Sequence, residues 1–256
     1  MVSRGTSVNG GPSWTRVRSG VGLAARSNHQ SEGSGGSSTG VGWIQVRSVV
    51  VHPDIDRVVR AFDHKLSPNQ EEQLHQYMSW LRREAIPAGG LGPAEASQLE
   101  NRHIADSLLY LPPDLRGETL LDIGSGVGLP GLVLAIAHPE MAVTLVDRSG
   151  RRLDLLRRAV RVVNVDNVHV VRAEVGREAI ESADVVTMRA VLPPAEAVVA
   201  VAAYAERFGV VGLSRTRRPD DVPGLCAEAE ALGFEGRVFH SDILDPPSWL
   251  LIMTRT

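Results

Sequence analysis

The feature that most constrains this chain is a regular alternation of strand-like and helical segments that begins near residue 119. Short apolar runs typical of strands lie at 119–123, 142–146, 168–171, 184–188, 210–213, 237–240 and 249–253. Helical stretches separate the earlier runs, at 129–137, 150–164, 194–207 and 222–232. Strands that alternate with helices form right-handed βαβ units around a parallel sheet with helices on both faces. A short proline-containing turn joins the last two runs, so the sequence predicts an α/β fold with a seven-stranded, mostly parallel sheet and an antiparallel edge.

Two segments precede this alternation. Residues 1–48 hold ten Gly and ten Ser without sustained periodicity, so we expect a disordered tail, either an interaction arm or sequence upstream of a misplaced start codon. Residues 49–111 show apolar positions at helical spacing, with Ser67 and Pro68 placed as a helix N-cap and first helical residue. The sequence therefore predicts a Gly/Ser-rich tail, a small helical N-terminal cap over 49–111, and an α/β domain over 112–256.

The composition excludes several classes of protein. Hydrophobic residues make up 43% of the chain, and its longest apolar runs fall far short of the roughly 20 residues of a membrane helix. No run of basic residues followed by a long apolar segment opens the chain, so we expect no secretory signal. The single cysteine, Cys226, favours a reducing compartment, so we expect a cytoplasmic protein. No His, Cys and carboxylate cluster has ligand spacing, so we expect no metal.

The net charge of −3 is unevenly distributed. Residues 1–48 carry five Arg and one Glu, or +4, which leaves −7 on the other 208 residues. An acidic body argues against broad binding to nucleic acid, so an RNA substrate would have to meet a local basic face.

The strongest local motif follows the first strand and reads LDIGSGVGLPG over 121–131. Glycines permit a tight turn and let a ligand approach the backbone closely. Gly126, Gly128 and Gly131 spell the GxGxxG of a dinucleotide site, but that pattern begins too late after the strand. The pattern in place is an acid, one residue and GxGxG, which resembles motif I of class I S-adenosylmethionine (SAM) methyltransferases. Asp122 is then placed for the amino-acid tail and sulfonium of SAM, directly or through a water.

Two more acidic residues follow later strands. Asp147 ends the second strand, 23 residues after Gly124, where a carboxylate can accept hydrogen bonds from both ribose hydroxyls. Its other interpretation is an ordinary acidic turn. Glu174 follows the third strand, where class I methyltransferases commonly contact adenine, although a solvent-facing Glu is the commoner explanation there.

Five segments resemble one family, the rRNA small-subunit methyltransferase G family, also called glucose-inhibited division protein B. They read RHIADSL (102–108), LDIGSGVGLPG (121–131), HPEMAVTLVDRSGRR (138–152), NVHVVRAE (167–174) and DVVTMRAV (184–191). The resemblance implies a Rossmann-like class I methyltransferase fold and methyl transfer from SAM to guanine N7 in 16S rRNA of the 30S subunit. N7 carries a free lone pair and no proton, so this reaction requires positioning rather than a general base.

The resemblance also implies which residues bind the cofactor. With the motif residues above, the predicted SAM-binding set is Asp122, Gly124, Ser125, Gly126, Gly128, Leu129, Asp147, Arg148, Ala173, Glu174 and Arg189. We expect no catalytic acid or base, with Arg189 in a supporting role through contact with the SAM carboxylate or an RNA phosphate. A structural salt bridge is the other interpretation of Arg189. His103 and Asp106 are expected to tie the N-terminal helices to the core, and Trp80 to pack in it.

The likeness weakens on the substrate side. The chain reads EAIPAGGLGP after the Trp80 helix where the family continues with an NLT-type segment, and Ser248-Trp249 stands where the family has an Arg-His pair. The alternatives are therefore a methyltransferase of a small molecule and a SAM-binding protein without turnover. Arginines crowd one helix, as either a solvated face or a phosphate-binding strip, with a second patch at 215–218. They are Arg148, Arg151, Arg152, Arg157, Arg158 and Arg161.

Overall fold

The computed structural model describes residues 52–214 and 219–256, which belong to one compact unit. The predicted tail over 1–48 and the arginines at 215–218 lie outside the described residues. The described residues form one seven-stranded sheet in the order β3-β2-β1-β4-β5-β7-β6. Its strands are β1 (Thr119–Ile123), β2 (Ala142–Asp147), β3 (Val168–Arg172), β4 (Ala183–Arg189), β5 (Ala205–Ser214), β6 (Phe234–Ser241) and β7 (Ser248–Arg255). This arrangement confirms the predicted Rossmann-like class I methyltransferase fold.

Strand direction determines where a site can form. Strands β1 to β5 pair in parallel, with β1 between β2 and β4, whereas β7 runs antiparallel to both β5 and β6. The carboxyl ends of β1, β2 and β4 therefore meet at one edge of the sheet, at Ile123, Asp147 and Arg189. The first residues of β7 lie at this same edge, because Leu250 is opposite Gly212 near the end of β5.

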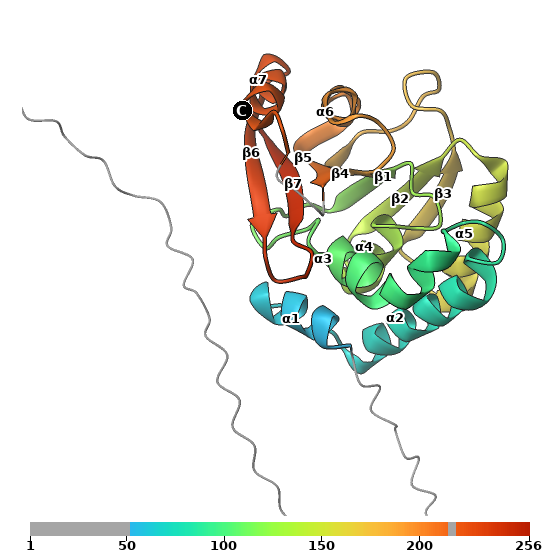
Figure 1. The fold of residues 1–256 in the computed structure, drawn as a ribbon. Helices are drawn as coiled ribbons and strands as arrows, with labels where there is room; N and C mark the ends of the chain where they lie inside the picture. The colour runs from blue at the N-terminus through green and yellow to red at the C-terminus, as the bar shows by residue number, and fades with distance from the viewer. Residues whose placement is uncertain (1–51, 215–218) are drawn as a thin grey trace, which may run out of the picture. The chain divides into compact units, whose positions relative to one another are not determined.

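Helices cover both faces of the sheet (Figure 1). Alternate strand residues point to opposite faces, so Leu120 and Val185 pack in the core with α1, α2, α4 and α5, whereas Leu121 and Val186 pack in the core with α6 and α7. The helices are α1 (Pro53–Ala61), α2 (Pro68–Trp80), α3 (Asp106–Leu108), α4 (Gly131–Ala137), α5 (Gly150–Val163), α6 (Pro194–Ala202) and α7 (Val222–Ala231). Three short helices of other types are the π-helical η1 (Leu81–Ala85), the 3-10 helix η2 (Pro93–Gln98) and the π-helical η3 (Leu99–Ala105).

Local signals in the sequence account for the helix ends. The hydroxyl of Ser67 accepts a hydrogen bond from the amide of Gln70, and the amide of Ser67 donates to the side chain of Gln70, which together form the capping box of α2. Gly233 follows α7 with a φ of +83°, a conformation that suits glycine after a helix end. The predicted start of α2 at Pro68 is thus confirmed, and the helix predicted over 222–232 ends one residue earlier, at Ala231.

Two predicted helices differ from the structure. The helix expected over 194–207 ends at Ala202, because the amide of Ala183 in β4 bonds to the carbonyl of Tyr204 and draws the chain into β5. Pairing between strands decides this boundary, since the Ala- and Val-rich sequence contains no breaker there. Within the segment 49–111, where the sequence predicts helices, the part that includes Arg102-His103-Ile104 and Leu108-Leu109 is the succession η2, η3 and α3 rather than one α-helix.

The N-terminal helices share a core with the sheet. The side-chain amide of Gln70 donates to the carbonyls of Ile136 and Ala137 at the end of α4, at 2.9 Å each. The apolar residues of α1 and α2 belong to the same cluster as those of β1 and α4. A boundary between cap and domain at 111/112 stays a prediction. No helix in the described part of the chain has the length and apolar character needed to cross a membrane.

Candidate functional site

The glycine-rich turn after β1 forms one wall of the candidate site. The amides of Gly124 and Ser125 both donate to the carbonyl of Val146 in β2, at 2.8 and 2.9 Å, which fixes the turn at the carboxyl edge of the sheet. Gly124 and Gly126 have φ angles of +72° and +60°, in a backbone region that residues other than glycine rarely adopt. The turn therefore presents bare backbone at Gly126, whereas the side chain of Val191 packs against Gly124.

Asp122 lies beneath this turn. Its carboxylate accepts hydrogen bonds from the amide of Gly131 at 3.0 Å and from the hydroxyl of Thr187 at 2.9 Å, so it joins β1 to the start of α4 and to β4. Complete burial raises the pKa of Asp122, against the lowering effect of these bonds. Asp122 is not among the residues that line the pocket described below. Its contact with a cofactor stays a prediction, and its observed role is to hold the turn.

Asp147 ends β2 next to the turn. One carboxylate oxygen accepts from the amide of Gly126 at 3.1 Å and lies 3.7 Å from the guanidinium of Arg152, and the other accepts from the amide of Ser149 at 2.8 Å. The carboxylate is nearly buried, at 3% side-chain exposure. Asp147 is not among the residues that line the pocket described below, so its contact with a ribose stays a prediction.

A pocket of about 600 Å³ opens at this edge of the sheet. It lies within the size range of about 300–1,000 Å³ that is usual for small-molecule sites. Of the predicted cofactor residues, the pocket is lined by Gly124, Ser125, Gly126, Leu129 and Arg189.

The other predicted residues lie outside the lining. Gly128 faces the interior, because an added Cβ would approach Leu132 to 2.9 Å and the hydroxyl of Tyr77 to 3.0 Å. Arg148 and Glu174 form an exposed ion pair at 3.5 Å, and the amide of Ala173 donates to the carbonyl of Asp147 at 3.3 Å. These three residues adjoin Asp147 across the β2–β3 edge, so their contact with a cofactor stays a prediction.

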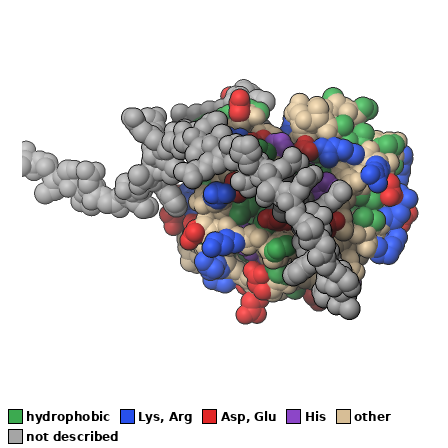
Figure 2. Space-filling model, turned by 90° about the horizontal axis from the view of Figure 1, so that it is seen from below, with side chains coloured by type: hydrophobic (Ala, Val, Ile, Leu, Met, Phe, Trp, Pro, Cys, Tyr) green, Lys and Arg blue, Asp and Glu red, His purple; other side chains and the backbone are tan. Residues whose placement is uncertain are grey.

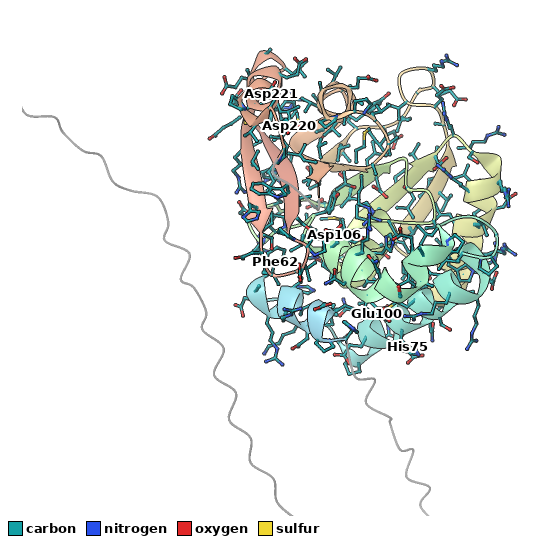
Figure 3. The ribbon with its side chains drawn as sticks, in the orientation of Figure 1. Phe62, His75, Glu100, Asp106, Asp220 and Asp221 are labelled. Atoms are coloured by element: carbon teal, nitrogen blue, oxygen red, sulfur yellow. The ribbon has the colours of Figure 1, made fainter. Side chains whose placement is uncertain are left out.

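Arg189 has features of both roles that the sequence left open, a structural salt bridge and a residue of the site. Its guanidinium lies 3.3 Å from the carboxylate of Asp106 and donates to Ser107, with a side-chain exposure of 16% for Arg189 and 3% for Asp106. Asp106 also accepts a hydrogen bond from the hydroxyl of Ser248 in β7. Figure 3 labels Asp106, the first residue of α3. Arg189 is thus ion-paired and lines the pocket, and Asp106 links the N-terminal helices to two strands.

His103 lines the same part of the pocket. Its Nε2 lies 2.8 Å from the carboxylate of Glu95, while its Nδ1 is buried with no hydrogen-bond partner. Burial lowers the pKa of His103, with a further contribution from the positive charge of Arg189. A neutral imidazole therefore lies here at neutral pH.

The loop between η1 and η2 closes the pocket over the glycine-rich turn. Gly90 packs so closely on this turn that an added Cβ would lie 2.5 Å from the Cγ1 of Val127. Arg151 of α5 donates to the carbonyl of Ala88 in the same loop. From beneath, the buried hydroxyl of Tyr77 donates to the carbonyl of Val127 at 2.9 Å, and burial raises the pKa of Tyr77, so it stays protonated. The N-terminal helices therefore help to position the turn.

Several pocket residues were missed by sequence reasoning. They are Gly90, Leu91, Gly92, Glu95, Tyr110, Leu192, Pro194 and Trp249. One indirect signal for them was present in the sequence. The loop before η2 and the pair Ser248-Trp249 are segments in which the chain does not resemble the family. At the end of β4, Ala190 has a φ of +55°, which is uncommon for a residue with a side chain and often accompanies a functional site.

The arginines of α5 are mostly paired with carboxylates. Arg157 lies 3.6 Å from Asp154, Arg158 lies 3.5 Å from Glu84, and Arg161 has no ion pair among the described residues. Figure 2 shows Lys and Arg side chains interspersed with Asp and Glu on the side of the molecule where α5 lies. In residues 52–214 and 219–256, no three His, Cys, Asp or Glu side chains are grouped to hold a metal ion. Trp80 is 3% exposed and stacked on Tyr77, so it packs in the core as predicted.

Comparison with known proteins identifies the family. Residues 70–215 match the family described as GidB, rRNA small subunit methyltransferase G. A relative named ribosomal RNA small subunit methyltransferase G, from Acidothermus cellulolyticus, is 38% identical over 136 residues, which cover 53% of this chain and 61% of the relative. A relative of the same name from Mycobacterium marinum is 32% identical over 192 residues, which cover 72% of this chain and 84% of the relative. The chain thus spans less than two-thirds of the first relative and more than two-thirds of the second.

A solved structure supports the fold alone. The pyocyanin biosynthetic protein PhzM superposes with a TM-score of 0.51 at 17% identity, over 71% of this chain and 61% of that chain. The family match takes in the glycine-rich turn, Asp147 and Arg189 and covers more than half of the residues. The chain therefore belongs to the rRNA small subunit methyltransferase G family.

Proposed function

We propose that this protein transfers a methyl group from SAM to guanine N7 in 16S rRNA of the small ribosomal subunit. The observation that carries the proposal is membership of the rRNA small subunit methyltransferase G family, whose matched region spans 70–215. The pocket at the carboxyl edge of the sheet agrees with this activity, since ligands of open α/β sheets bind at that edge. The cytoplasm is where such a protein would meet its substrate.

The residues at this edge fit SAM. Bare backbone at Gly126, where an added Cβ would meet nothing closer than 3.9 Å, lets a ligand approach closely, and it borders a pocket of about 600 Å³. Asp147 provides a carboxylate for the ribose hydroxyls, with Ala173 and Glu174 beyond it for adenine. Asp122 holds the turn rather than reaching into the pocket. When bound, SAM supplies an electrophilic methyl group.

The chain's contribution to the reaction is positioning and exclusion of water. Guanine N7 has a lone pair and no proton to lose, so the neutral imidazole of His103 need not act as a base. The loop at 86–92 covers the turn and keeps water from the reacting atoms. Arg189, fixed by Asp106, presents a guanidinium to the pocket that can bind a carboxylate or a phosphate.

Methyl transfer to purified ribosomal subunits tests the proposal. The full chain would be incubated with methyl-labelled SAM and 30S subunits from a strain that lacks this methylation, beside fully methylated 30S subunits as the matched control. We expect label in 16S rRNA from the first preparation only, at guanine N7. A protein that binds SAM in calorimetry but leaves both rRNA preparations unlabelled would contradict the proposal.

A small-molecule substrate is the second candidate. The acidic body of the chain and the altered segments at 86–93 and 248–249, both beside the pocket, favour it. Label that appears in a metabolite extract and in no RNA would establish this alternative. Tight SAM binding with no labelled product from either source would leave a SAM-binding protein without turnover.

A further inference from the structure

Trp249 is an aromatic ring at the pocket that the cofactor motifs do not use. It lies at the start of β7, beside the end of β5, and it lines the pocket together with Arg189 and Leu213. The ring is half-buried and stacks on His240 of β6, with ring centroids 3.9 Å apart and an interplanar angle of 29°. One face of the indole is thus covered by His240 of the neighbouring strand, and Trp249 borders the pocket.

The backbone around Trp249 is held firmly. The preceding residue, Ser248, donates its hydroxyl to Asp106, which is ion-paired with Arg189 of β4. On either side, Trp249 pairs with β5 and with His240 of β6. A ring fixed in this way can bind a planar ligand without first becoming ordered, which reduces the entropy lost on binding.

The rest of this part of the pocket is largely aliphatic. Leu192, Leu213 and Pro194 line it, and Tyr110, although also a lining residue, is only 2% exposed. Trp249 is therefore the broad aromatic surface available to a ligand among the described lining residues. Trp80, by contrast, is buried away from the pocket.

We propose that Trp249 is the stacking platform for the purine that accepts the methyl group, and that its π face stabilises the positive charge that this purine acquires. The inference rests on the proposed function and names the residue that holds the acceptor. The two neighbouring residues have different roles, since Ser248 binds Asp106 while Trp249 borders the pocket.

The charge that moves in the reaction makes an aromatic platform effective. The lone pair of guanine N7 forms a bond to the methyl carbon, the bond between that carbon and sulfur breaks, and its electron pair remains on sulfur. The donor leaves as a neutral thioether, and the positive charge passes to the purine without loss of a proton. An aromatic face attracts a cationic ring more strongly than a neutral one, so Trp249 would bind the transition state better than the substrate.

Three substitutions at one position separate aromatic stacking from bulk. Trp249→Phe keeps a π face, Trp249→Leu keeps apolar volume without one, and Trp249→Ala removes both. We expect the single-turnover rate of methyl transfer to 30S subunits to fall about 5- to 100-fold in the Leu and Ala variants, the range of base–aromatic stacking. The Phe variant should stay within about threefold of the wild type, and the dissociation constant of SAM should change less than twofold in all three.

A second measurement uses nucleotides as probes. Guanosine monophosphate and 7-methylguanosine monophosphate differ in the charge of the purine, and we expect the wild type and Trp249→Phe to bind the methylated nucleotide more tightly in calorimetry. Trp249→Leu should lose this preference, and because it keeps a larger apolar side chain than Ala, it serves where the Ala variant fails to fold.

The outcomes of these experiments distinguish the stacking role of Trp249 from the methyltransferase activity itself. A Leu variant that transfers methyl as fast as the wild type, or whose SAM affinity falls in parallel with its rate, would overturn the role of Trp249 while leaving the methyltransferase activity standing. A wild-type protein that labels no 30S rRNA would overturn the proposed function, and the stacking role with it.

Discussion

Arg189 is both a structural and a pocket residue. Its ion pair with Asp106 connects β4 to α3, and Asp106 passes the connection to β7 through Ser248. The motif that contains Arg189 indicated a functional role, but its partner was not predictable, since Asp106 lies 83 residues earlier in the sequence. A buried pair of this kind specifies one arrangement of three segments more than it adds stability, because both charges lose hydration.

A double-mutant cycle measures this coupling. Arg189→Met and Asp106→Asn should each lower the free energy of unfolding by about 3 kcal/mol, since each breaks the ion pair between two nearly buried side chains. The double variant should cost less than the sum of the two, by about 1–3 kcal/mol, because the same ion pair is lost only once. Urea denaturation at neutral pH provides the values, and strictly additive losses would contradict the coupling.

His103 should make stability depend on pH. Its pKa is lowered by burial in the folded protein, so below the unfolded value of about 6.5 the unfolded state binds the proton more readily. This contribution to stability is complete above that pH and is lost as the pH falls through it. His103→Gln keeps a donor for Glu95 and removes the titration.

The measurement compares the wild type with His103→Gln in urea at pH 8 and pH 5.5. The wild type should lose more stability than the variant, by up to about 1.4 kcal/mol for each unit of pKa shift. Equal losses in the two proteins would show that protonation of His103 is not linked to unfolding.

At the scale of elements, the strands were more predictable than the helix ends. Parallel strands buried on both faces are continuous apolar runs between turn residues, so β1 matches its predicted range of 119–123 and the other strands differ mainly in length. The end of α6 was not predictable from local sequence, because the pairing of Ala205 with Ala183 replaces helical structure that the Ala-rich segment would otherwise favour.

The pocket was predictable only on its cofactor side. The glycine-rich turn and Asp147 lie within two consecutive βα units, so short-range spacing identifies them. The opposite side is assembled from the loop at 86–92, from η3 and α3, and from the start of β7. Those segments meet only through long-range packing, and no spacing in the sequence indicates that Trp249 and Arg189 share a cavity.

Two neighbouring glycines test the role of the loop at 86–92. A methyl group at Gly90 would lie 2.5 Å from Val127 and displace the loop from the glycine-rich turn, whereas one at Gly92 meets nothing closer than 3.7 Å. We expect Gly90→Ala to weaken SAM binding by about 10-fold, as for a site loosened by a loss of about 1.4 kcal/mol. Gly92→Ala, the matched control in the same loop, adds the same methyl group without a clash and should change the affinity for SAM less than Gly90→Ala does in calorimetry. Equal affinities in both variants would show that the loop does not support the turn.

At the scale of the molecule, charge decides how RNA can approach. The residues beyond position 48 carry a net −7, and most arginines of α5 already face a carboxylate. An RNA phosphate must therefore compete with Asp154 and Glu84 unless it binds at Arg161. We propose that the outward face of α5, defined by Arg157 and Arg161, is the phosphate-binding strip, and that its contribution is electrostatic and sensitive to salt.

Two double variants, each of which removes two positive charges from a different part of the surface, test the phosphate-binding strip. Arg157→Ala/Arg161→Ala should weaken binding to 30S subunits and reduce the slope of log affinity against log salt by about two units. Arg60→Ala/Arg237→Ala changes the net charge equally but alters α1 and β6, so its slope should match that of the wild type. Filter binding between 50 and 200 mM salt, about the range over which such slopes are resolved, gives both. Identical slopes in the two variants would show that Arg157 and Arg161 face solvent and bind no RNA phosphate.

The hydrogen bond from Tyr77 to the carbonyl of Val127 has a consequence for how the sequence can diverge. A backbone acceptor is present whatever side chain position 127 carries, so this bond restricts Tyr77 and, by the lack of space beside its hydroxyl, Gly128. The side chain of Val127 is restricted instead by Gly90 above it. Among homologous sequences, a larger side chain at position 90 should therefore be accompanied by a smaller one at position 127. Positions 77 and 128 should both stay Tyr and Gly.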